Sequence, residues 1–308
     1  MMRLTIIGFG NQARAWAQNL HDSHFPVRVA LRAQSSSFES AKSLGLETVE
    51  IGSEEFYQDK AFVLLTPDDS HHEFMLMHAH GFQPGTTLLY NHGFSLTKYH
   101  FEKNFPQFHH VLFAVKAIGA EIRRQYLLKG KLGGVYSLEY IKENSDELLG
   151  WMKKLADGLG LNMGLYPTTF KNETQADLYS EQGLLCSVVP YTAAKVFEHL
   201  VESGIEPELA YFECWHELKL IVDAMVEKGP QGFYDLISPN ALIGSEKGYQ
   251  KLMTGEFEKN LKSLLQDIQS EKFNHEIEKV DVEALRKTIN TRWEKSPLME
   301  TFKKMNRN

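Results

Sequence analysis

Four carboxylates stand in two pairs at helical spacing in the second half of the chain. Asp177 and Glu181 are four residues apart, and Glu213 and Glu217 repeat that spacing. Residues i and i+4 share one face of a helix, and both pairs lie in apolar stretches, where unpartnered carboxylates are costly to bury. A hard divalent cation relieves that cost, and oxygen ligands without a Cys or His cluster favour magnesium over zinc. The four residues are therefore candidate Mg2+ ligands, and structural ion pairs with nearby lysines are the alternative.

A glycine-rich turn near the N-terminus suits a dinucleotide. The pattern G-x-G-x-x-A occupies residues 8–13, directly after an apolar run and directly before a helix-like stretch. Gly8 permits a tight turn, Gly10 lets the backbone approach a pyrophosphate, and Ala13 lets the helix pack closely on the strand. A ligand-free turn between a strand and a helix is the alternative. The predicted cofactor contacts in this turn are Gly8, Gly10, Asn11 and Gln12.

The end of the next predicted strand indicates which dinucleotide binds. An NAD-binding domain normally has an Asp or Glu about 20 residues after the glycine turn, but this chain has Arg32 followed by three serines at 35–37. A guanidinium and hydroxyls suit an extra phosphate, so Arg32, Ser35 and Ser37 predict NADPH rather than NADH. An ordinary polar loop is the alternative. Thr66 and Pro67 end another predicted strand, at the rim where such sheets bind ligands, and we expect both to contact the cofactor.

The predicted secondary structure that positions these residues changes near residue 167, from alternating strands and helices to helices alone. Before it, short apolar runs alternate with amphipathic stretches, which is typical of βαβ units and a parallel sheet. After it, apolar residues recur at helical spacing to the end of the chain. We predict an α/β Rossmann domain with a doubly wound parallel sheet at 1–167 and an all-helical domain at 168–308. The predicted strands are 4–7, 27–31, 61–65, 87–90 and 111–115, with a further candidate at 133–140.

Composition narrows the classes of function. The 308 residues are 43% hydrophobic and 24% charged, and they carry a formal net charge of −7. That charge argues against binding to nucleic acid or to anionic membranes, and no uninterrupted apolar run reaches the ~20 residues of a membrane span. Two cysteines, Cys186 and Cys214, are too few for a disulfide framework, and we expect both to be buried thiols. We therefore expect a cytoplasmic protein that acts on a small molecule.

Taken in order, these motifs resemble those of the ketol-acid reductoisomerase family, also called acetohydroxy acid isomeroreductase. The resemblance extends over nearly the whole chain, and its two carboxylate motifs are the most specific part. The similar segments are 8–12, 31–37, 65–68, 92–94, 169–171 with 177–182, 210–223 and 237–241. The resemblance implies an enzyme of branched-chain amino-acid synthesis that uses NADPH and two Mg2+ ions to convert acetolactate-type acids to dihydroxy acids by alkyl migration and hydride transfer.

The resemblance also assigns roles to the carboxylates. It implies the short form of the family with a single knotted domain, in which a homodimer or higher homo-oligomer shares each active site between two chains. Asp177 would bridge the two Mg2+ ions, and Glu181 would complete the first metal site. Glu213 and Glu217 would reach in from the other subunit, with Glu217 as the general acid and base.

Three further residues receive roles in the same way. Ser238 would bind the substrate carboxylate, while Lys116 and His92 would border the substrate and the nicotinamide.

The loop around Lys116 departs from the family pattern. The family's Pro-Lys-Gly-Pro-Gly-His appears here as Val115-Lys116-Ala117-Ile118-Gly119-Ala120, and Asn91, Tyr136 and Pro239 also differ from the usual residues. We expect a reshaped loop beside the nicotinamide. Two alternatives to the full reaction follow from these changes. One is a divergent NADPH-dependent reductase of another small 2-keto or 2-hydroxy acid, and the other is a non-catalytic NADPH sensor.

Overall fold

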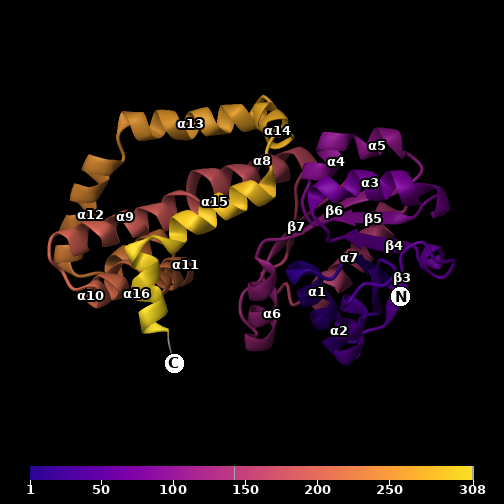
Figure 1. The fold of residues 1–308 in the computed structure, drawn as a ribbon. Helices are drawn as coiled ribbons and strands as arrows, with labels where there is room; N and C mark the ends of the chain where they lie inside the picture. The colour runs from indigo at the N-terminus through magenta and orange to yellow at the C-terminus, as the bar shows by residue number, and fades with distance from the viewer. Residues whose placement is uncertain (142, 307–308) are drawn as a thin grey trace. The chain divides into compact units, whose positions relative to one another are not determined.

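The computed structural model describes residues 1–141 and 143–306, and it divides the chain into two compact units (Figure 1). The first unit is Met1–Thr174 and the second is Gln175–Asn308. The predicted boundary at 167/168 falls a few residues earlier, where strand β8 (Leu165–Pro167) ends. Helix α8 (Phe170–Ser180) begins in the first unit and ends in the second.

The first unit is built on one eight-stranded sheet with the order β3-β2-β1-β4-β5-β6-β7-β8. Strands β1 to β6 run parallel, and the order reverses at β1, which is the doubly wound arrangement predicted from the alternating pattern. The predicted parallel doubly wound sheet is confirmed, and it contains one antiparallel pairing, that of β7 with β6. The strands are β1 (Leu4–Ile7), β2 (Val27–Leu31), β3 (Thr48–Glu50), β4 (Ala61–Leu64), β5 (Thr87–Tyr90), β6 (His109–Val115), β7 (Gly134–Tyr140) and β8.

Helices cover both faces of this sheet (Figure 1). Successive side chains of a strand point to opposite faces. Leu4 and Ile6 accordingly pack into one apolar cluster with Trp16 and Trp151, while Ile7 packs into the other cluster with Phe101. The α-helices of the first unit before α8 are α1 (Asn11–Asp22), α2 (Ser37–Ser43), α3 (Asp68–His78), α4 (Phe94–Tyr99), α5 (Phe101–Asn104), α6 (Gly119–Leu128) and α7 (Ser145–Leu159).

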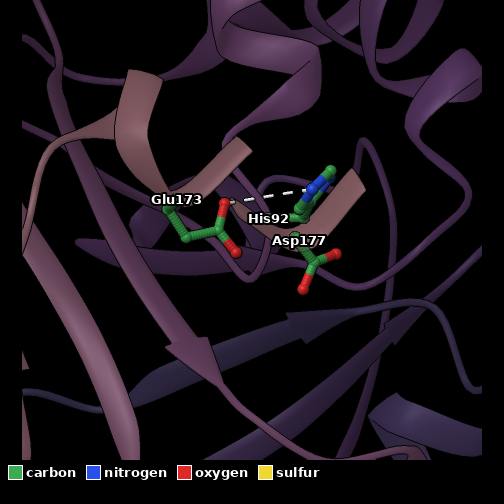
Figure 2. A group of neighbouring side chains, drawn as sticks. All are labelled: His92, Glu173 and Asp177. Atoms are coloured by element: carbon green, nitrogen blue, oxygen red, sulfur yellow. Dashed lines mark ion pairs between the residues drawn. The ribbon is translucent and has the colours of Figure 1, made fainter. Parts of the chain in front are cut away.

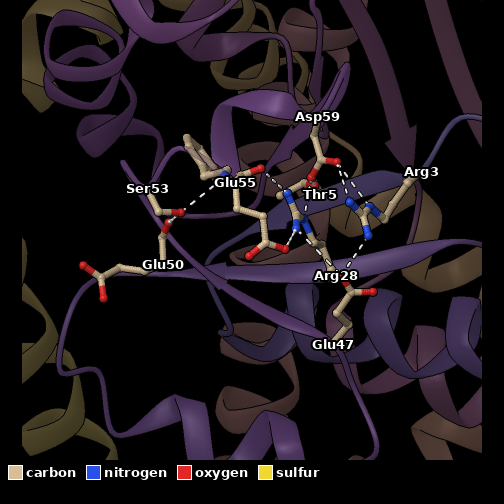
Figure 3. Close-up of polar contacts among 9 residues, drawn as sticks. Arg3, Thr5, Arg28, Glu47, Glu50, Ser53, Glu55 and Asp59 are labelled. Carbon is tan, nitrogen blue, oxygen red and sulfur yellow. Dashed lines mark hydrogen bonds and ion pairs between the residues drawn. The ribbon is translucent and has the colours of Figure 1, made fainter.

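A buried ion network ties the sheet together near the amino ends of its strands (Figure 3). The Arg28 side chain is fully buried on β2; its Nε donates to Asp59 Oδ2 at 2.6 Å and its Nη1 to Glu55 Oε1 at 2.5 Å. Thr5 on β1 also donates to Asp59. A buried guanidinium requires paired acceptors, and this network supplies them at the amino ends of the strands, opposite to their carboxyl ends.

The second unit contains only helices among its described residues. Two of its turns are π-helical, Glu181–Leu185 and Phe212–His216, and α11 is kinked at Gly229 (φ 70°) before Pro230. The expectation that the two cysteines are buried is wrong, because Cys186 is exposed and Cys214 is half-buried. The remaining helices are α9 (Val188–Glu202), α10 (Pro207–Tyr211), α11 (Glu217–Leu236), α12 (Pro239–Leu252), α13 (Gly255–Gln269), α14 (Lys272–Ile277), α15 (Val282–Glu294) and α16 (Pro297–Met305).

Candidate active site

Four predicted site residues follow the carboxyl ends of adjacent parallel strands. Gly8 comes directly after β1, and Thr66 lies two residues beyond the end of β4. His92 follows β5 in the same way, and Lys116 comes directly after β6. Since these strands are neighbours in the order β1-β4-β5-β6, the sheet brings residues from distant parts of the sequence to one edge. That edge is where open α/β sheets bind ligands.

The glycine turn has the geometry that its sequence predicts. Gly8 has φ +99°, and a Cβ there would lie 2.9 Å from the methyl carbon of Thr66, so a side chain is excluded by both conformation and space. A Cβ at Gly10 would meet no atom within 4 Å. Gly10 also precedes the first residue of α1, where no side chain caps the helix. An anion can therefore approach the backbone N–H groups at this helix start.

A cleft of about 620 Å³ extends from this turn across the ends of the strands. Most of the predicted cofactor contacts line it, whereas Asn11 and Gln12 lie beside it on the first turn of α1. Ser35 is tied back into its own loop, because its Oγ accepts a hydrogen bond from the backbone N–H of Ser37 at 3.3 Å. The predicted contacts that line the cleft are Gly8, Gly10, Arg32, Ser35, Ser37, Thr66 and Pro67.

Part of the cleft lining is largely apolar and was not predicted from the sequence. This part, here called the apolar slot, consists of Ile51, Phe74, Met77 and His78. The imidazole of His78 is held through Nδ1, which lies 2.9 Å from the hydroxyl of Tyr57. Burial, and secondarily the nearby His80, lower the pKa of His78, so its ring is neutral near pH 7. A neutral aromatic ring beside an apolar wall suits a purine base.

Glu173 is the principal site residue that the sequence reasoning missed. Its side chain is buried, and the whole residue is 4% exposed. Glu173 Oε1 accepts a hydrogen bond from Lys116 Nζ at 2.9 Å, and Oε2 accepts one from the backbone N–H of Gly93 at 2.7 Å. His92 Nε2 lies 3.9 Å from Glu173 Oε2, and Figure 2 shows the imidazole facing this carboxylate. One carboxylate thus joins the two residues expected to border the substrate.

The spacing along α8 could have revealed Glu173. Glu173, Asp177 and Glu181 form a series at i, i+4 and i+8, so the predicted pair Asp177 and Glu181 continues one turn towards the amino end. Figure 2 shows Glu173 and Asp177 on successive turns of this helix. An oxygen of each lies within 4.8 Å of the other. The sequence alone does not separate this acidic series from a solvated helix face.

Gly93 is required for this arrangement. A Cβ at Gly93 would lie 2.5 Å from the Thr174 hydroxyl and 2.7 Å from the carbonyl oxygen of Phe170. Only a residue without a side chain lets the first turn of α8 approach this closely. The beginning of α8 therefore docks directly on the segment that carries His92.

A second histidine lies behind His92. Asp68 Oδ2 lies 3.8 Å from His92 Nδ1, and Asp68 Oδ1 lies 3.7 Å from Nδ1 of the buried His71. Burial raises the pKa of Asp68, but hydrogen bonding from His92 and the charges of both imidazoles outweigh burial and hold that pKa below its ordinary value. Burial lowers the pKa of His71 more than Asp68 raises it. Asp68 is therefore an anion beside His92 near neutral pH.

The predicted metal ligands are placed differently from one another. Asp177 is half-buried, whereas Glu181, Glu213 and Glu217 are exposed on the described chain. The expectation that burial forces these four carboxylates onto a cation is therefore wrong for a single chain. Glu181 opens one π-helical turn, and Glu213 lies within the other. Such turns are frequently found at functional sites.

The charges of Asp177 and Glu181 both affect the pKa of the Cys186 thiol. Burial raises the pKa of Cys186, and the negative charges of Glu181 and Asp177 raise it further. Both carboxylates therefore lie close enough to Cys186 to disfavour its thiolate form.

Ser238 serves as a helix cap on the described chain. Its Oγ accepts a hydrogen bond from the backbone N–H of Ala241 at 3.2 Å, at the start of α12. The residue is exposed. Its predicted role towards a substrate carboxylate stays a prediction.

Comparisons with known proteins match both units. The family model of the acetohydroxy acid isomeroreductase NADPH-binding domain matches residues 2–164, and that of the ketol-acid reductoisomerase C-terminal domain matches residues 170–307. The ketol-acid reductoisomerase (NADP(+)) of Corynebacterium diphtheriae is 36% identical over 293 residues, which cover 92% of this chain and 83% of that protein.

Solved structures agree in fold. The NADH-preferring ketol-acid reductoisomerase from an uncultured archean is 26% identical with a TM-score of 0.88, over 99% of this chain and 94% of that chain. A pyrroline-5-carboxylate reductase from Coxiella burnetii is 13% identical with a TM-score of 0.61, over 87% of this chain and 98% of that chain. This second likeness concerns the fold alone.

Proposed function

The chain belongs to the ketol-acid reductoisomerase family, and from this premise we propose that it converts acetolactate-type 2-hydroxy-3-keto acids to dihydroxy acids with NADPH. It would thereby act in branched-chain amino-acid synthesis. The observation that carries the proposal is the placement of the glycine-turn cleft and the cluster of Lys116, Glu173 and His92 at the carboxyl ends of adjacent strands of one sheet. A hydride donor bound in the cleft would end beside that cluster.

The reaction requires groups that stabilise charge on oxygen. A proton leaves the C2 hydroxyl while an alkyl group moves from C2 to C3, and a hydride then reduces the new C2 carbonyl. The Lys116 ammonium can donate a hydrogen bond to an oxygen that gains charge, and Glu173 holds that ammonium in place. Glu217 of a partner chain would take up the hydroxyl proton and return it to the C3 oxygen. A proton from water would neutralise the C2 oxygen after the hydride is transferred. Bound Mg2+ supplies polarisation of the substrate oxygens, and NADPH supplies the hydride.

We propose that the cofactor is NADPH and that Arg32 sets the preference for NADPH over NADH. Arg32, Ser35 and Ser37 line the cleft where the adenosine ribose would lie, and Gly10 leaves the space that a pyrophosphate needs. Glu73 on α3 also lines this cleft. The similar archaeal enzyme is NADH-preferring, so the scaffold accepts either cofactor and the loop at 32–37 would decide.

The metal proposal is two Mg2+ ions. All four predicted ligands offer carboxylate oxygens, the donors that Mg2+ prefers, and Asp177 and Glu181 lie four residues apart along the chain. Asp177 and Glu181 would hold the ions from one chain, with Glu213 and Glu217 reaching in from the partner. That the last two are exposed on a single chain is compatible with this assignment.

A homodimer, with a knotted helical unit, completes the proposal. The second unit leaves many large apolar side chains exposed, more than a monomeric surface normally carries in one region. A cleft of about 700 Å³ between α11 and α12 is lined in part by Tyr234, Leu242 and Tyr249. The exposed side chains on these two helices and the turn after them are Leu220, Val222, Met225, Val226, Tyr234, Leu236, Leu242, Ile243, Tyr249, Leu252 and Met253.

We propose a cytoplasmic location for an enzyme with this function. One stretch of the described chain, Phe170–Glu202, is long and apolar enough to cross a membrane by length and composition, with a mean hydropathy of 1.2. The same stretch carries Glu173 inside the cluster with Lys116 and falls within the match to the C-terminal domain of the family. Helices of soluble proteins meet this criterion as well.

The test is NADPH oxidation by the purified protein with Mg2+, first with acetolactate and then with the rearranged 3-hydroxy-2-ketoisovalerate. Turnover of both is expected. Asp177→Asn should lower turnover by about a hundredfold or more, because the amide loses the charge that binds Mg2+, while the Kd for NADPH stays unchanged. Asp157→Asn, an exposed acid on α7, is the matched control and should match the wild type. Unchanged turnover in Asp177→Asn would remove the metal proposal.

One second candidate is a reductase that lacks the migration step, because the loop around Lys116 departs from the family pattern. Ile118 is 73% exposed in this loop. Gly119 packs so closely on the start of α1 that a Cβ would lie 2.6 Å from the backbone of Asn11. Turnover of 3-hydroxy-2-ketoisovalerate but not of acetolactate would support this candidate. NADPH binding with neither turnover would support a sensor.

A further inference from the structure

Two of the departures from the family pattern contact each other. Asn91 Oδ1 accepts a hydrogen bond from the backbone N–H of Val115 at 3.2 Å. Asn91 directly precedes His92, and Val115 directly precedes Lys116. A single side-chain contact therefore joins the two strand ends that carry the residues of the Glu173 cluster.

The contact lies where the backbone ladder between these strands stops. Strands β5 and β6 are paired from Thr87↔His109 to Tyr90↔Leu112, but β6 continues to Val115. On its other side, β6 remains paired with β7 through Val115↔Gly134. On the β5 side, the amide oxygen of Asn91 accepts from the Val115 N–H and so replaces the backbone carbonyl that a longer β5 would offer. Val115 is 4% exposed, so its N–H requires an acceptor within the protein.

We propose that Asn91 is a positioning residue whose amide fixes the distance between the ends of β5 and β6 and thereby holds Lys116 against Glu173. Two anchors then fix the Lys116 backbone. Its own N–H donates to the carbonyl of Gly133 at 3.1 Å on the β7 side, and the preceding N–H is held from the β5 side by Asn91. The role of Lys116 towards substrate rests on the proposed function, whereas its placement does not.

The same geometry makes the two departures compensate each other. A proline at 115 has no N–H, and an acceptor at 91 is then unnecessary. With valine at 115, the N–H exists and Asn91 satisfies it. The effects of changing the two positions should therefore be coupled rather than additive.

The experiment compares Asn91→Ala, Val115→Pro and the double variant with the wild type. The first measurement is the rate at which acetic anhydride modifies Lys116 in the native protein, read by mass spectrometry relative to the exposed Lys154. The second measurement separates kcat from KM for acetolactate, and the third is the Kd for NADPH. Ser53→Ala is the matched control, since it also removes a side-chain acceptor from a backbone N–H, that of Phe56, far along the same unit.

Asn91→Ala is expected to raise the modification rate of Lys116 several-fold and to lower kcat roughly tenfold, because small displacements of a positioned group are costly in rate. The Kd for NADPH should stay within about twofold of the wild type. Adding Val115→Pro should restore both the modification rate and kcat. Ser53→Ala should lower the melting temperature without changing either.

Two outcomes would overturn the proposal. One is that Asn91→Ala lowers the melting temperature like Ser53→Ala but leaves Lys116 modification and kcat unchanged, which would make the contact purely structural. The other is that the double variant is no better than Asn91→Ala. If the wild type turns over neither acid, the proposed function fails, and the modification rate of Lys116 still decides whether Asn91 positions it.

Discussion

Replacing Glu173 by glutamine changes one oxygen of a buried carboxylate into an N–H2 group. Glu173 now accepts from two donors, the Lys116 ammonium at 2.9 Å and the Gly93 N–H at 2.7 Å. Glutamine has one acceptor oxygen, so whichever way the amide turns, its N–H2 group faces a donor. The lost charge-assisted hydrogen bond is worth about 1.5–3 kcal/mol before relaxation.

Relaxation differs between the two donors. The Lys116 side chain is 42% exposed, so the ammonium can turn to water, whereas the buried Gly93 N–H cannot. We expect the amide oxygen to stay on Gly93 and Lys116 to move away. The free energy of unfolding should then fall by only about 1–2 kcal/mol, because an exposed partner recovers its hydration. Turnover should fall about a hundredfold, since the ammonium is no longer placed.

The assay pairs urea unfolding with steady-state NADPH oxidation. Glu139→Gln is the control, because Glu139 also accepts a backbone N–H at the start of α8, from Phe170 at 2.7 Å, yet it is exposed and its side chain is not a partner of Lys116 or His92. It should lose stability without losing turnover. Equal losses of turnover in both variants would refute the reasoning, because the effect would then come from the docking of α8 rather than from the placement of Lys116.

Three further predictions concern the first unit. Arg32→Asp should move the ratio of kcat/KM for NADPH over NADH by at least about tenfold towards NADH, since a charge-assisted contact to phosphate is lost and a like charge is added; an unchanged ratio would count against the phosphate loop. His78→Ala should weaken binding of both NADPH and 2′,5′-ADP by about tenfold in calorimetry, as loss of an aromatic wall predicts, and equal affinities would exclude a base in that slot. Burial chiefly lowers the pKa of His110, so the unfolded chain takes up a proton that the folded chain resists. Its contribution to the free energy of unfolding is therefore complete above about pH 6.5 and is lost as the pH falls below that. His110→Gln should flatten the decline in urea stability between about pH 7.5 and pH 5.5, and an identical decline would assign the pH dependence to other groups.

Several features followed from the sequence because their requirements are local. The turn at Gly8 needs a positive φ and a close neighbour, and glycine is the residue that meets both. Alternation in β1 assigns its side chains to two faces, and the structure buries Ile6 and Ile7 in opposite clusters. The parallel pairing of the first six strands followed from the alternation of strands and helices, because parallel strands need a crossover connection.

Other features depended on tertiary structure because their partners are distant in sequence. Glu173 meets Lys116 57 residues away and Gly93 80 residues away, and no periodicity records such pairings. The antiparallel direction of β7 is likewise absent from an apolar pattern. Exposure of Glu213 and Glu217 was also unpredictable, since spacing identifies a shared helix face but not what covers it. The sequence therefore determines which chemical groups are present. The distances between these groups and their burial are set only by the folded sheet, which brings the ends of its strands together.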